Sequence, residues 1–250
     1  MERTALRGRL TWLEAEVVQL VQETARVKTI VFRVPGWTGH LPGQHVDIRL
    51  TAEDGYQAQR SYSIANANNN EHVALTVEAV ENGEVSPYLV DELVAGDRIE
   101  LRGPIGGYFV WEPSLGGPLQ LIAGGSGLVP LMAMIRSQKS YASPVRTNLV
   151  ASARSWEELI YRDELEKLSR ERDDFDVVYT LTRSQPHGWN GYRRRIDKDL
   201  LAASTFAVEE APLIFVCGPT GFVEAAAAIM LELGHQPGGI KTERFGPSGG

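Results

Sequence analysis

The stretch Gln59-Arg60-Ser61-Tyr62-Ser63-Ile64-Ala65-Asn66 decides how the rest of the sequence is interpreted. Polar and apolar residues alternate along it at a period near two, which predicts a β-strand. Arg60 carries a cationic fork suited to a phosphate, and Tyr62, on the same face, offers a ring for stacking. With the Ser63 hydroxyl, these side chains suit a large planar cofactor with a phosphorylated tail, such as a flavin. An amphipathic strand with a surface arginine is the alternative that these residues alone leave open.

Composition narrows the class of protein. The 250 residues are 43% hydrophobic and 23% charged, which is typical of a soluble globular protein with one large domain or two of ordinary size. We expect a cytoplasmic protein, because the start lacks an apolar leader and no apolar run approaches the roughly 20 residues that cross a bilayer. The single cysteine, Cys217, excludes an internal disulfide and an all-cysteine iron–sulfur cluster, and five isolated histidines predict no metal site.

Charge argues against nucleic acid as the main partner. The net charge is −7, and no nucleic-acid or membrane partner is expected. The run Arg193-Arg194-Arg195 is a candidate for a phosphate or an acidic partner, although such a run is more often a solvated surface.

The first half of the chain reads as short strands without long helices. Strands are predicted over residues 12–21, 27–34, 44–50, 58–66, 73–80 and 98–102, separated by turns rich in Gly, Pro and Asn. Six short antiparallel strands favour a closed barrel, because closure removes exposed edges. The Pro- and Gly-rich segment 112–118 predicts the domain boundary, which gives a barrel domain over residues 1–114 and a second domain over residues 115–250.

A glycine turn in the first half precedes a predicted helix. Ser86 followed by Pro87 predicts the helix start, and Leu89 and Leu93 form its apolar face. The turn at Gly83 then presents backbone N–H groups to an anion. A capped helix without a ligand is an equally good interpretation of this segment.

The second half alternates strands with helices, which predicts a doubly wound parallel sheet. Strands are expected at 119–123, 145–151, 176–181, 213–219 and 240–246, and helices at 131–138, 156–172 and 221–233. The first strand runs into Gly124-Gly125-Ser126-Gly127-Leu128-Val129-Pro130, a turn that lets the backbone approach a ligand closely. It is not the Gly-x-Gly-x-x-Gly fingerprint, because Pro130 stands at the third glycine. Taken alone, Cys217 is a buried core thiol.

These motifs, in this order, resemble the ferredoxin–NADP reductase superfamily over essentially the whole chain. Arg60-Ser61-Tyr62-Ser63 is similar to its flavin-binding signature, and Gly83, Val85 and Ser86 match the Gly-x-x-Ser loop that holds the FAD pyrophosphate. We add Val77, in the strand before this loop, to the cofactor-binding residues. Two phosphate-binding features favour FAD over FMN. The resemblance also implies that Phe245 covers the flavin face.

The second half resembles the nucleotide-binding part of the same superfamily. Gly124, Gly125, Ser126, Gly127 and Pro130 match its loop for the NAD(P) pyrophosphate. Thr182 and Arg183 occupy the place of a pair that often grips the 2′-phosphate of NADP(H), with Arg154 and Arg193 as helpers. No acidic residue directly ends strand 176–181, which favours NADPH over NADH. Cys217-Gly218-Pro219 is similar to the motif beside the nicotinamide, and Glu243 is implied near the reactive end.

The resemblance therefore implies a flavoprotein reductase that passes hydride from NAD(P)H to FAD, with Ser63, Cys217 and Glu243 at the reacting atoms. Electrons would then pass singly to a separate protein, such as a ferredoxin or an oxygenase or metalloenzyme component. Relatives often carry a fused [2Fe–2S] domain, which the one cysteine of this chain cannot supply. Two alternatives stay open: a reductase of diffusible acceptors such as free flavin or ferric chelates, and a non-enzymatic redox-sensing or electron-transfer subunit.

Overall fold

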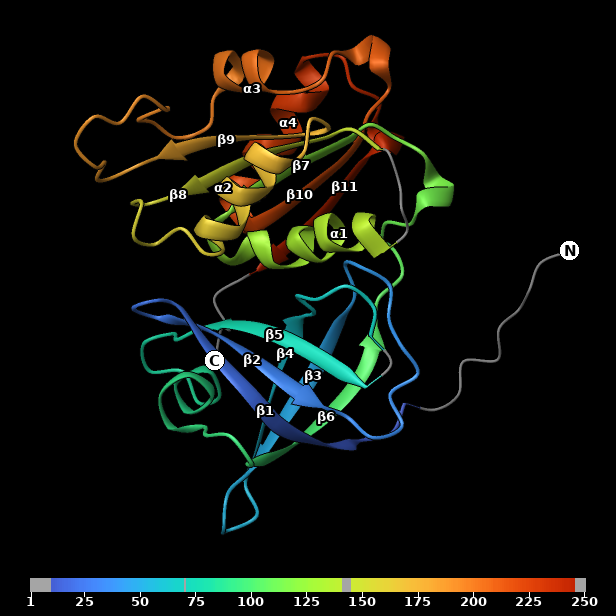
Figure 1. Ribbon diagram of the computed structural model, residues 1–250, viewed down its shortest axis with the longest axis vertical. Coiled ribbons are helices and arrows are strands. Elements are labelled where there is room, and N and C mark those ends of the chain that lie inside the picture. The colour runs from blue at the N-terminus through green and yellow to red at the C-terminus, as the bar shows by residue number, and fades with distance from the viewer. Residues whose placement is uncertain (1–9, 70, 141–144, 246–250) are drawn as a thin grey trace, which may run out of the picture.

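The computed structural model describes residues 10–69, 71–140 and 145–245, which form a barrel and a sheet covered by helices, one stacked on the other (Figure 1). In the described part of the chain, the barrel contains six strands in the order β4-β3-β6-β1-β2-β5, with neighbours antiparallel. These strands are β1 (Leu13–Thr24), β2 (Val27–Arg33), β3 (His45–Thr51), β4 (Gln57–Ser63), β5 (His72–Glu78) and β6 (Arg98–Ile105).

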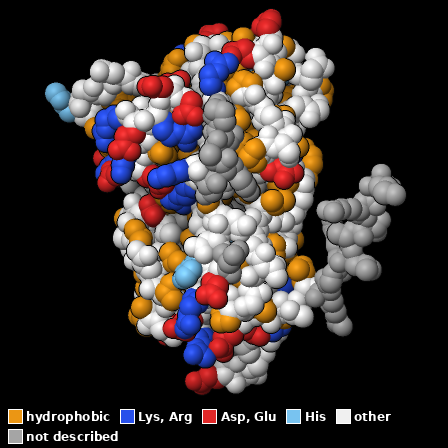
Figure 2. Space-filling model, turned by 45° about the vertical axis from the view of Figure 1, so that its right-hand side comes forward, with side chains coloured by type: hydrophobic (Ala, Val, Ile, Leu, Met, Phe, Trp, Pro, Cys, Tyr) orange, Lys and Arg blue, Asp and Glu red, His pale blue; other side chains and the backbone are white. Residues whose placement is uncertain are grey.

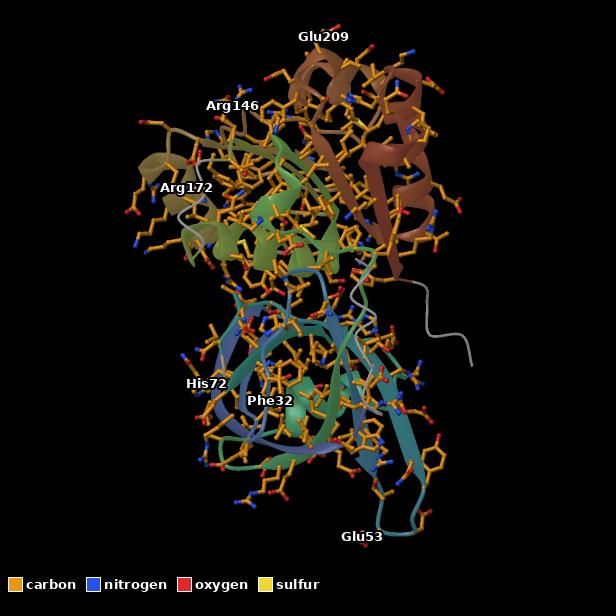
Figure 3. All side chains as sticks on the ribbon, turned by 90° about the vertical axis from the view of Figure 1, so that its right-hand side faces the viewer. Phe32, Glu53, His72, Arg146, Arg172 and Glu209 are labelled. Carbon is orange, nitrogen blue, oxygen red and sulfur yellow. The ribbon has the colours of Figure 1, made fainter. Side chains whose placement is uncertain are left out.

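The barrel closes between its two outer strands, β4 and β5. An antiparallel bridge pairs Ile64 with Leu75, and the Ala65 N–H donates to the Ala74 carbonyl at 2.8 Å. Inside, Phe32, Ile48 and Leu75 are fully buried, and Figure 3 shows Phe32 within the barrel wall. The barrel predicted from the alternating pattern is confirmed.

The helix predicted to start at Ser86 is confirmed, but it is short and ends as a π-helical turn. The segment makes a single π-helical turn, η1 (Tyr88–Glu92), in which Leu89 is buried, and Leu93 is buried just after it. The Ser86 hydroxyl accepts the Val80 N–H at 3.1 Å, so it ties together the two sides of the loop instead of capping a long helix.

The second sheet has five parallel strands in the order β11-β10-β7-β8-β9 within the described residues. They are β7 (Leu119–Gly124), β8 (Thr147–Ala153), β9 (Phe175–Leu181), β10 (Leu213–Pro219) and β11 (Ile240–Phe245). Its helices are α1 (Leu128–Ser140), α2 (Arg162–Glu171), α3 (Lys198–Ser204) and α4 (Thr220–Glu232).

The helices cover both faces of this sheet, which confirms the doubly wound prediction. Leu121 and Leu149 belong to the hydrophobic cluster that also holds the buried residues of α1 and α2. Their strand neighbours Ile122 and Val150 belong to the cluster of α3 and α4, because successive side chains on a strand point to opposite faces. Figure 1 shows α1 between the sheet and the barrel. The helix α3 was not among the helices predicted from the sequence.

The helix predicted over residues 156–172 is also corrected. The helix α2 begins only at Arg162, because Tyr161 adopts a left-handed conformation with φ of 56°. This conformation costs a residue with a Cβ roughly 1–2 kcal/mol. Leu159, Ile160 and Tyr161 are instead buried in the cluster that also contains Val27 and Ala74 of the barrel. The strained turn therefore aims an apolar segment at the barrel.

A buried hydrogen-bond chain, here called the interface clamp, joins the two halves through Glu23, Thr29, Thr76 and Tyr161. The Tyr161 hydroxyl donates to Thr76 Oγ1, which lies 2.7 Å from Thr29 Oγ1. Thr29 in turn donates to Glu23 Oε1 at 2.7 Å, and Glu23 Oε2 accepts the Tyr161 N–H at 3.4 Å. Because Tyr161 belongs to the second half and the other three to the barrel, this chain fixes their relative position.

Arg136 of α1 adds a second connection between the halves. Its Nη1 donates at 2.7 Å to the carbonyl of Ala65, two residues after the end of β4. Its guanidinium pairs with Glu164 of α2 and lies 4.6 Å from the centre of the Tyr161 ring. The barrel end at Ala65 is thus held to both α1 and α2.

Figure 2 shows acidic and basic side chains interspersed over the face that it draws. No helix in residues 10–69, 71–140 and 145–245 has the length and apolar character needed to span a membrane. Nor do these residues contain a group of three or more His, Cys, Asp or Glu side chains able to hold a metal ion.

The turn between β7 and α1 packs against the backbone of β10. A Cβ added at Gly127 would lie 2.1 Å from the Cys217 carbonyl oxygen and 2.7 Å from the Gly218 nitrogen. Gly125 differs, because it has φ of +56° but open space around its missing side chain. The two positions therefore require glycine for different reasons: Gly127 permits close backbone packing, and Gly125 permits a left-handed turn.

We expect three alanine variants to rank accordingly in thermal unfolding. Gly127→Ala forces the turn off β10 and should cost at least about 1–3 kcal/mol, the usual cost of overpacking. Gly125→Ala should cost about 1–2 kcal/mol through its backbone conformation. Gly221→Ala, near the start of α4 with open space around it, should be neutral or stabilising by about 0.5–1 kcal/mol. Equal melting temperatures for the first and third variants would contradict the packing described.

Candidate functional site

Three cavities share wall residues with one another: one is lined by the barrel alone, and two are lined by both the barrel and the sheet half. The barrel cavity, of about 520 Å³, is lined by Arg60, Ser61, Tyr62, Glu78, Val80, Glu81, Asn82, Gly83, Glu84, Val85 and Ser86. The junction cavity, of about 410 Å³, is lined by His45, Ser61, Tyr62, Ser63, Thr76, Glu78, Val80, Ser126, Val129, Glu243, Arg244 and Phe245. The sheet-edge cavity, of about 500 Å³, is described below.

The barrel cavity brings Arg60 onto the same wall as the loop from Gly83 to Ser86. The Arg60 guanidinium lies 2.9 Å from Glu84 Oε2, and both side chains are partly exposed. Glu84 Oε1 also accepts the Tyr56 hydroxyl at 2.7 Å. The predicted phosphate ligand and the predicted phosphate loop thus meet in space, with a carboxylate between them that an arriving phosphate would have to compete with.

The junction cavity gathers residues from both halves of the chain. Tyr62 and Ser63 come from the end of β4, and Glu243 and Phe245 from β11. Burial raises the pKa of the Tyr62 phenol well above its usual value, so the ring is neutral at physiological pH. Ser61 donates its hydroxyl to Asp47 Oδ1 at 2.7 Å, so that side chain is already engaged with the barrel.

Cys217 and Glu243 are adjacent because β10 and β11 pair in parallel and place them opposite one another. The thiol donates to Glu243 Oε2 at 3.8 Å. Burial, and then the nearby carboxyl, raise the pKa of the Cys217 thiol well above its usual range, so it is not a thiolate nucleophile. Burial also raises the pKa of Glu243 to about 7, which makes it the carboxyl at this junction that changes charge near neutral pH.

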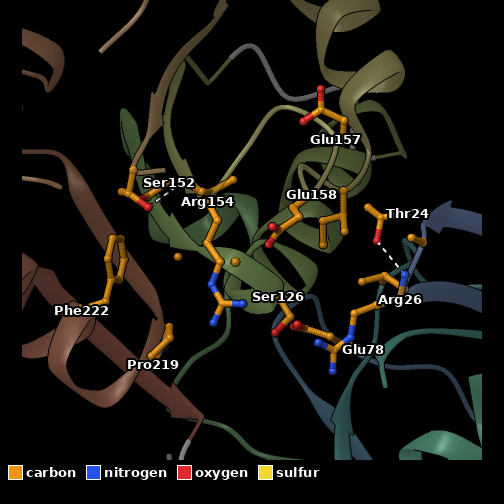
Figure 4. Close-up of a pocket in the computed structure, with 17 residues that line it drawn as sticks. Thr24, Arg26, Glu78, Ser126, Ser152, Arg154, Glu157, Glu158, Pro219 and Phe222 are labelled. Atoms are coloured by element: carbon orange, nitrogen blue, oxygen red, sulfur yellow. Dashed lines mark hydrogen bonds between the residues drawn. The ribbon is translucent and has the colours of Figure 1, made fainter. Parts of the chain in front are cut away.

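The sheet-edge cavity lies at the carboxyl ends of the parallel strands, where open α/β sheets bind ligands (Figure 4). Its walls are Thr24, Ala25, Arg26, Val27 and Glu78 of the barrel, with Gly124, Gly125, Ser126, Ser152, Ala153, Arg154, Glu157, Glu158, Ile160, Thr182, Pro219 and Phe222 of the sheet. Figure 4 shows the Arg154 side chain directed into the cavity from the end of β8. Hydrogen bonds from its own backbone and then from the Ser155 side chain lower the pKa of Glu157, so this carboxylate adds a negative charge to the cavity wall.

Several predicted site residues lie off these three walls. Val77, Gly127 and Cys217 are buried in the hydrophobic packing. Pro130 sits in the first turn of α1, where a proline is tolerated, and Gly218 follows Cys217 in β10. Arg183 donates its backbone N–H to the Arg154 carbonyl at 2.9 Å, and its side chain is not part of the cavity wall. The roles predicted for these residues stay predictions.

The arginine run that follows β9 is occupied by local contacts. Arg193 donates to the Trp189 carbonyl at 2.7 Å, and Arg194 lies 3.0 Å from Asp197. Neither residue lines any of the three cavities, so the geometry favours a surface role for this run.

Sequence reasoning missed several wall residues. Thr76 and Glu78 share one face of β5, and polar residues interrupting an otherwise apolar strand were the signal available for them. His45 and Arg26 offered no such signal, because each becomes a wall residue only when distant strands meet.

Comparisons with known proteins agree with this geometry. A family model described as an oxidoreductase FAD-binding domain matches residues 14–110, and one described as an oxidoreductase NAD-binding domain matches residues 121–228. Together these matches define a flavin- and nicotinamide-binding oxidoreductase. The chain belongs to the ferredoxin–NADP reductase superfamily.

Individual relatives cover the chain to different extents. The glycine betaine monooxygenase reductase subunit of Pseudomonas aeruginosa is 31% identical over 240 residues, which are 92% of this chain and 63% of that protein. The NADH-cytochrome b5 reductase 1 of Aspergillus terreus is 31% identical over 77% of this chain and 67% of its own length. The cytochrome P450 reductase structure from Amycolatopsis aligns with a TM-score of 0.83 and 27% identity, over 98% of this chain and 74% of that one. This chain therefore spans less than two thirds of the first relative.

The raised pKa of Glu243 predicts a pH-dependent stability. Because the folded protein binds this proton more tightly than the unfolded chain, the stabilisation is complete below the unfolded value of 4.5 and lost as pH rises through about 7. Relative to Glu243→Gln, the wild-type free energy of unfolding should fall by roughly 1–3 kcal/mol between pH 5 and pH 8. Urea unfolding of both proteins at several pH values measures this difference. A difference that does not change with pH would show that Glu243 titrates normally.

Proposed function

We propose that the chain is a flavoprotein reductase that takes hydride from NAD(P)H onto FAD and passes electrons to a separate protein. The supporting observation is the sharing of wall residues among the three cavities. Tyr62 and Glu78 line both the barrel and junction cavities, and Ser126 lines both the junction and sheet-edge cavities. Two elongated cofactors entering from opposite ends would therefore meet in the junction cavity.

The barrel and junction cavities fit FAD. Tyr62 and Phe245 of β11, which both line the junction cavity, would hold the flavin ring by stacking. Arg60 and the backbone of the Gly83–Ser86 loop hold the pyrophosphate in the barrel cavity. The loop adds a second phosphate-binding element beside Arg60, which favours a dinucleotide over FMN. Because Glu84 pairs with Arg60, a bound phosphate shares or displaces that carboxylate.

The chain's own residues orient the reaction. Bound FAD supplies a two-electron acceptor for hydride and releases electrons singly to the next protein. Ser63 offers a hydroxyl at the flavin edge, and the neutral Cys217 thiol holds the Glu243 carboxyl toward the same point. The domain boundary proposed within residues 112–118 separates the two binding halves.

The sheet-edge cavity fits the nicotinamide nucleotide. Its pyrophosphate lies at the Gly124–Ser126 turn before α1, where backbone N–H groups and the helix dipole favour an anion. We propose NADPH as the preferred donor, with Arg154 and Thr182 binding the 2′-phosphate. Glu157 and Glu158 line the same cavity and repel that phosphate, so the preference over NADH is small.

The acceptor is proposed to be a protein. Two similar proteins carry names that pair them with oxygenases, a glycine betaine monooxygenase and a cytochrome P450. By analogy, an oxygenase or other metalloenzyme component, or a ferredoxin, receives the electrons here.

Anaerobic rapid mixing of the FAD-loaded protein with NADPH and, in parallel, with NADH tests this function. The flavin absorbance near 450 nm should bleach within about milliseconds to seconds, at the rates typical of enzymatic turnover. NADPH should saturate at the lower concentration, because only it carries the phosphate that Arg154 binds.

Dithionite reduction of the same sample is the control. If dithionite bleached the flavin and neither nucleotide did, electron entry from NAD(P)H would be excluded and a redox-sensing role would replace the reductase. A lower saturating concentration for NADH would reverse the proposed preference alone.

A further inference from the structure

Arg26 of the barrel lines the sheet-edge cavity, although it lies about one hundred residues before the glycine turn of the sheet. It occupies the two-residue turn between β1 and β2. Figure 4 shows Arg26 and Glu78 on the barrel side of the cavity, with Arg154 entering from the opposite side. Among the residues that line this cavity, the cationic side chains are those of Arg26 and Arg154.

Arg26 is anchored at this position through both its backbone and its side chain. Its carbonyl accepts the Ala79 N–H at 2.9 Å, and its Nη2 donates to the Ala79 carbonyl at 2.7 Å. Its own N–H donates to Thr24 Oγ1 at 3.3 Å. One donor of the guanidinium fork thus holds the side chain against β5, and an arginine has five N–H donors in all. The remaining donors are available at the exposed edge of the cavity.

The interface clamp fixes the turn that carries Arg26 against the sheet. Glu23, three residues earlier, accepts the Thr29 hydroxyl and the Tyr161 N–H. Val27, the next residue, packs in the same hydrophobic cluster as Ile160 and Tyr161. The position of Arg26 relative to the glycine turn is therefore set by buried contacts on both sides.

The carboxylates of the cavity wall repel an anionic ligand, and a cation beside them offsets this repulsion. Glu78, Glu157 and Glu158 line it alongside the two arginines. A dinucleotide pyrophosphate carries two negative charges at neutral pH, and the backbone N–H groups of the turn approach it from the sheet side only. Without Arg26, the barrel side would present Glu78 and no compensating charge.

We propose that Arg26 binds the pyrophosphate of the nicotinamide nucleotide from the barrel side, so that both domains hold the nucleotide. This inference rests on the proposed function of the cavity. It assigns separate tasks to the two arginines. Arg26 contacts a group that NADH and NADPH share, whereas Arg154 contacts the 2′-phosphate that only NADPH carries.

Arg26→Ala should therefore weaken the binding of NADPH and of NADH by the same factor, about tenfold or more. This is the loss expected when a charge-assisted hydrogen bond is removed. The nucleotide concentration that gives half-maximal flavin reduction measures this factor in anaerobic rapid mixing. The limiting rate of flavin reduction at saturating nucleotide should stay within about twofold of the wild-type rate. The lost contact stabilises the bound nucleotide and the transition state equally, so its loss affects binding alone. Arg154→Ala should weaken the binding of NADPH and leave the binding of NADH unchanged. Arg33→Ala is the matched control, since Arg33 is an exposed arginine at the end of β2 that pairs with Glu16 and does not line the cavity.

FAD content and dithionite reduction establish that each variant is folded, and Arg26→Lys provides a second, milder change that should retain part of the affinity. Unchanged half-saturation for both nucleotides in Arg26→Ala would overturn the inference, as would a loss confined to NADPH or an equal loss in Arg33→Ala. These outcomes differ from failure of the reductase function, in which the wild-type flavin itself would not bleach with either nucleotide.

Discussion

The buried hydrogen-bond chain between the two halves is the constraint on which the site depends. Neither half contains a complete site, because the junction cavity takes Tyr62 and Ser63 from the barrel and Glu243 and Phe245 from the sheet. Their separation is set by the interface clamp through Tyr161 and by the contact of Arg136 with the Ala65 carbonyl. The left-handed Tyr161 stores strain in the backbone, and the contacts that its side chain makes with both halves compensate for it. Orientation of two cofactors is therefore built into the domain interface.

The fold was largely predictable, because period-two alternation and glycine or proline turns report local structure directly. The prediction failed where tertiary contacts decide. Trp156, Leu159 and Ile160 have helix-compatible spacing, yet Leu159 and Ile160 are buried in a cluster shared with the barrel, and the Trp156 ring packs on Tyr179 and Trp189. The helix that starts at Ser86 ends at Glu92 as a π-helical turn, and the Ser86 hydroxyl accepts the Val80 N–H instead of a helix N–H. The helix Lys198–Ser204 is capped by Asp197, a signal that was present but not used.

The sequence motifs of the candidate site could be predicted, but several residues that line its cavities could not. Resemblance marked Arg60, Tyr62 and Gly124, and they do line cavities. It could not separate Gly127, which is needed for contact with the Cys217 backbone, from Gly125, which is needed for its φ. Nor could it find Arg26, a common residue in a hairpin turn, because its relevance arises only when the barrel docks on the sheet. Charge compensation across a domain interface is a property of the assembled structure.

The central claim is that nicotinamide and flavin meet face to face in the junction cavity. Anaerobic single-turnover reduction with NADPH carrying deuterium at the transferred C4 position tests it most directly, by comparison with unlabelled NADPH at saturation. Direct transfer predicts that bleaching slows with the label and that the deuterium does not exchange with solvent before transfer. Bleaching at the same limiting rate with and without deuterium would contradict a direct encounter of the two cofactors in this cavity.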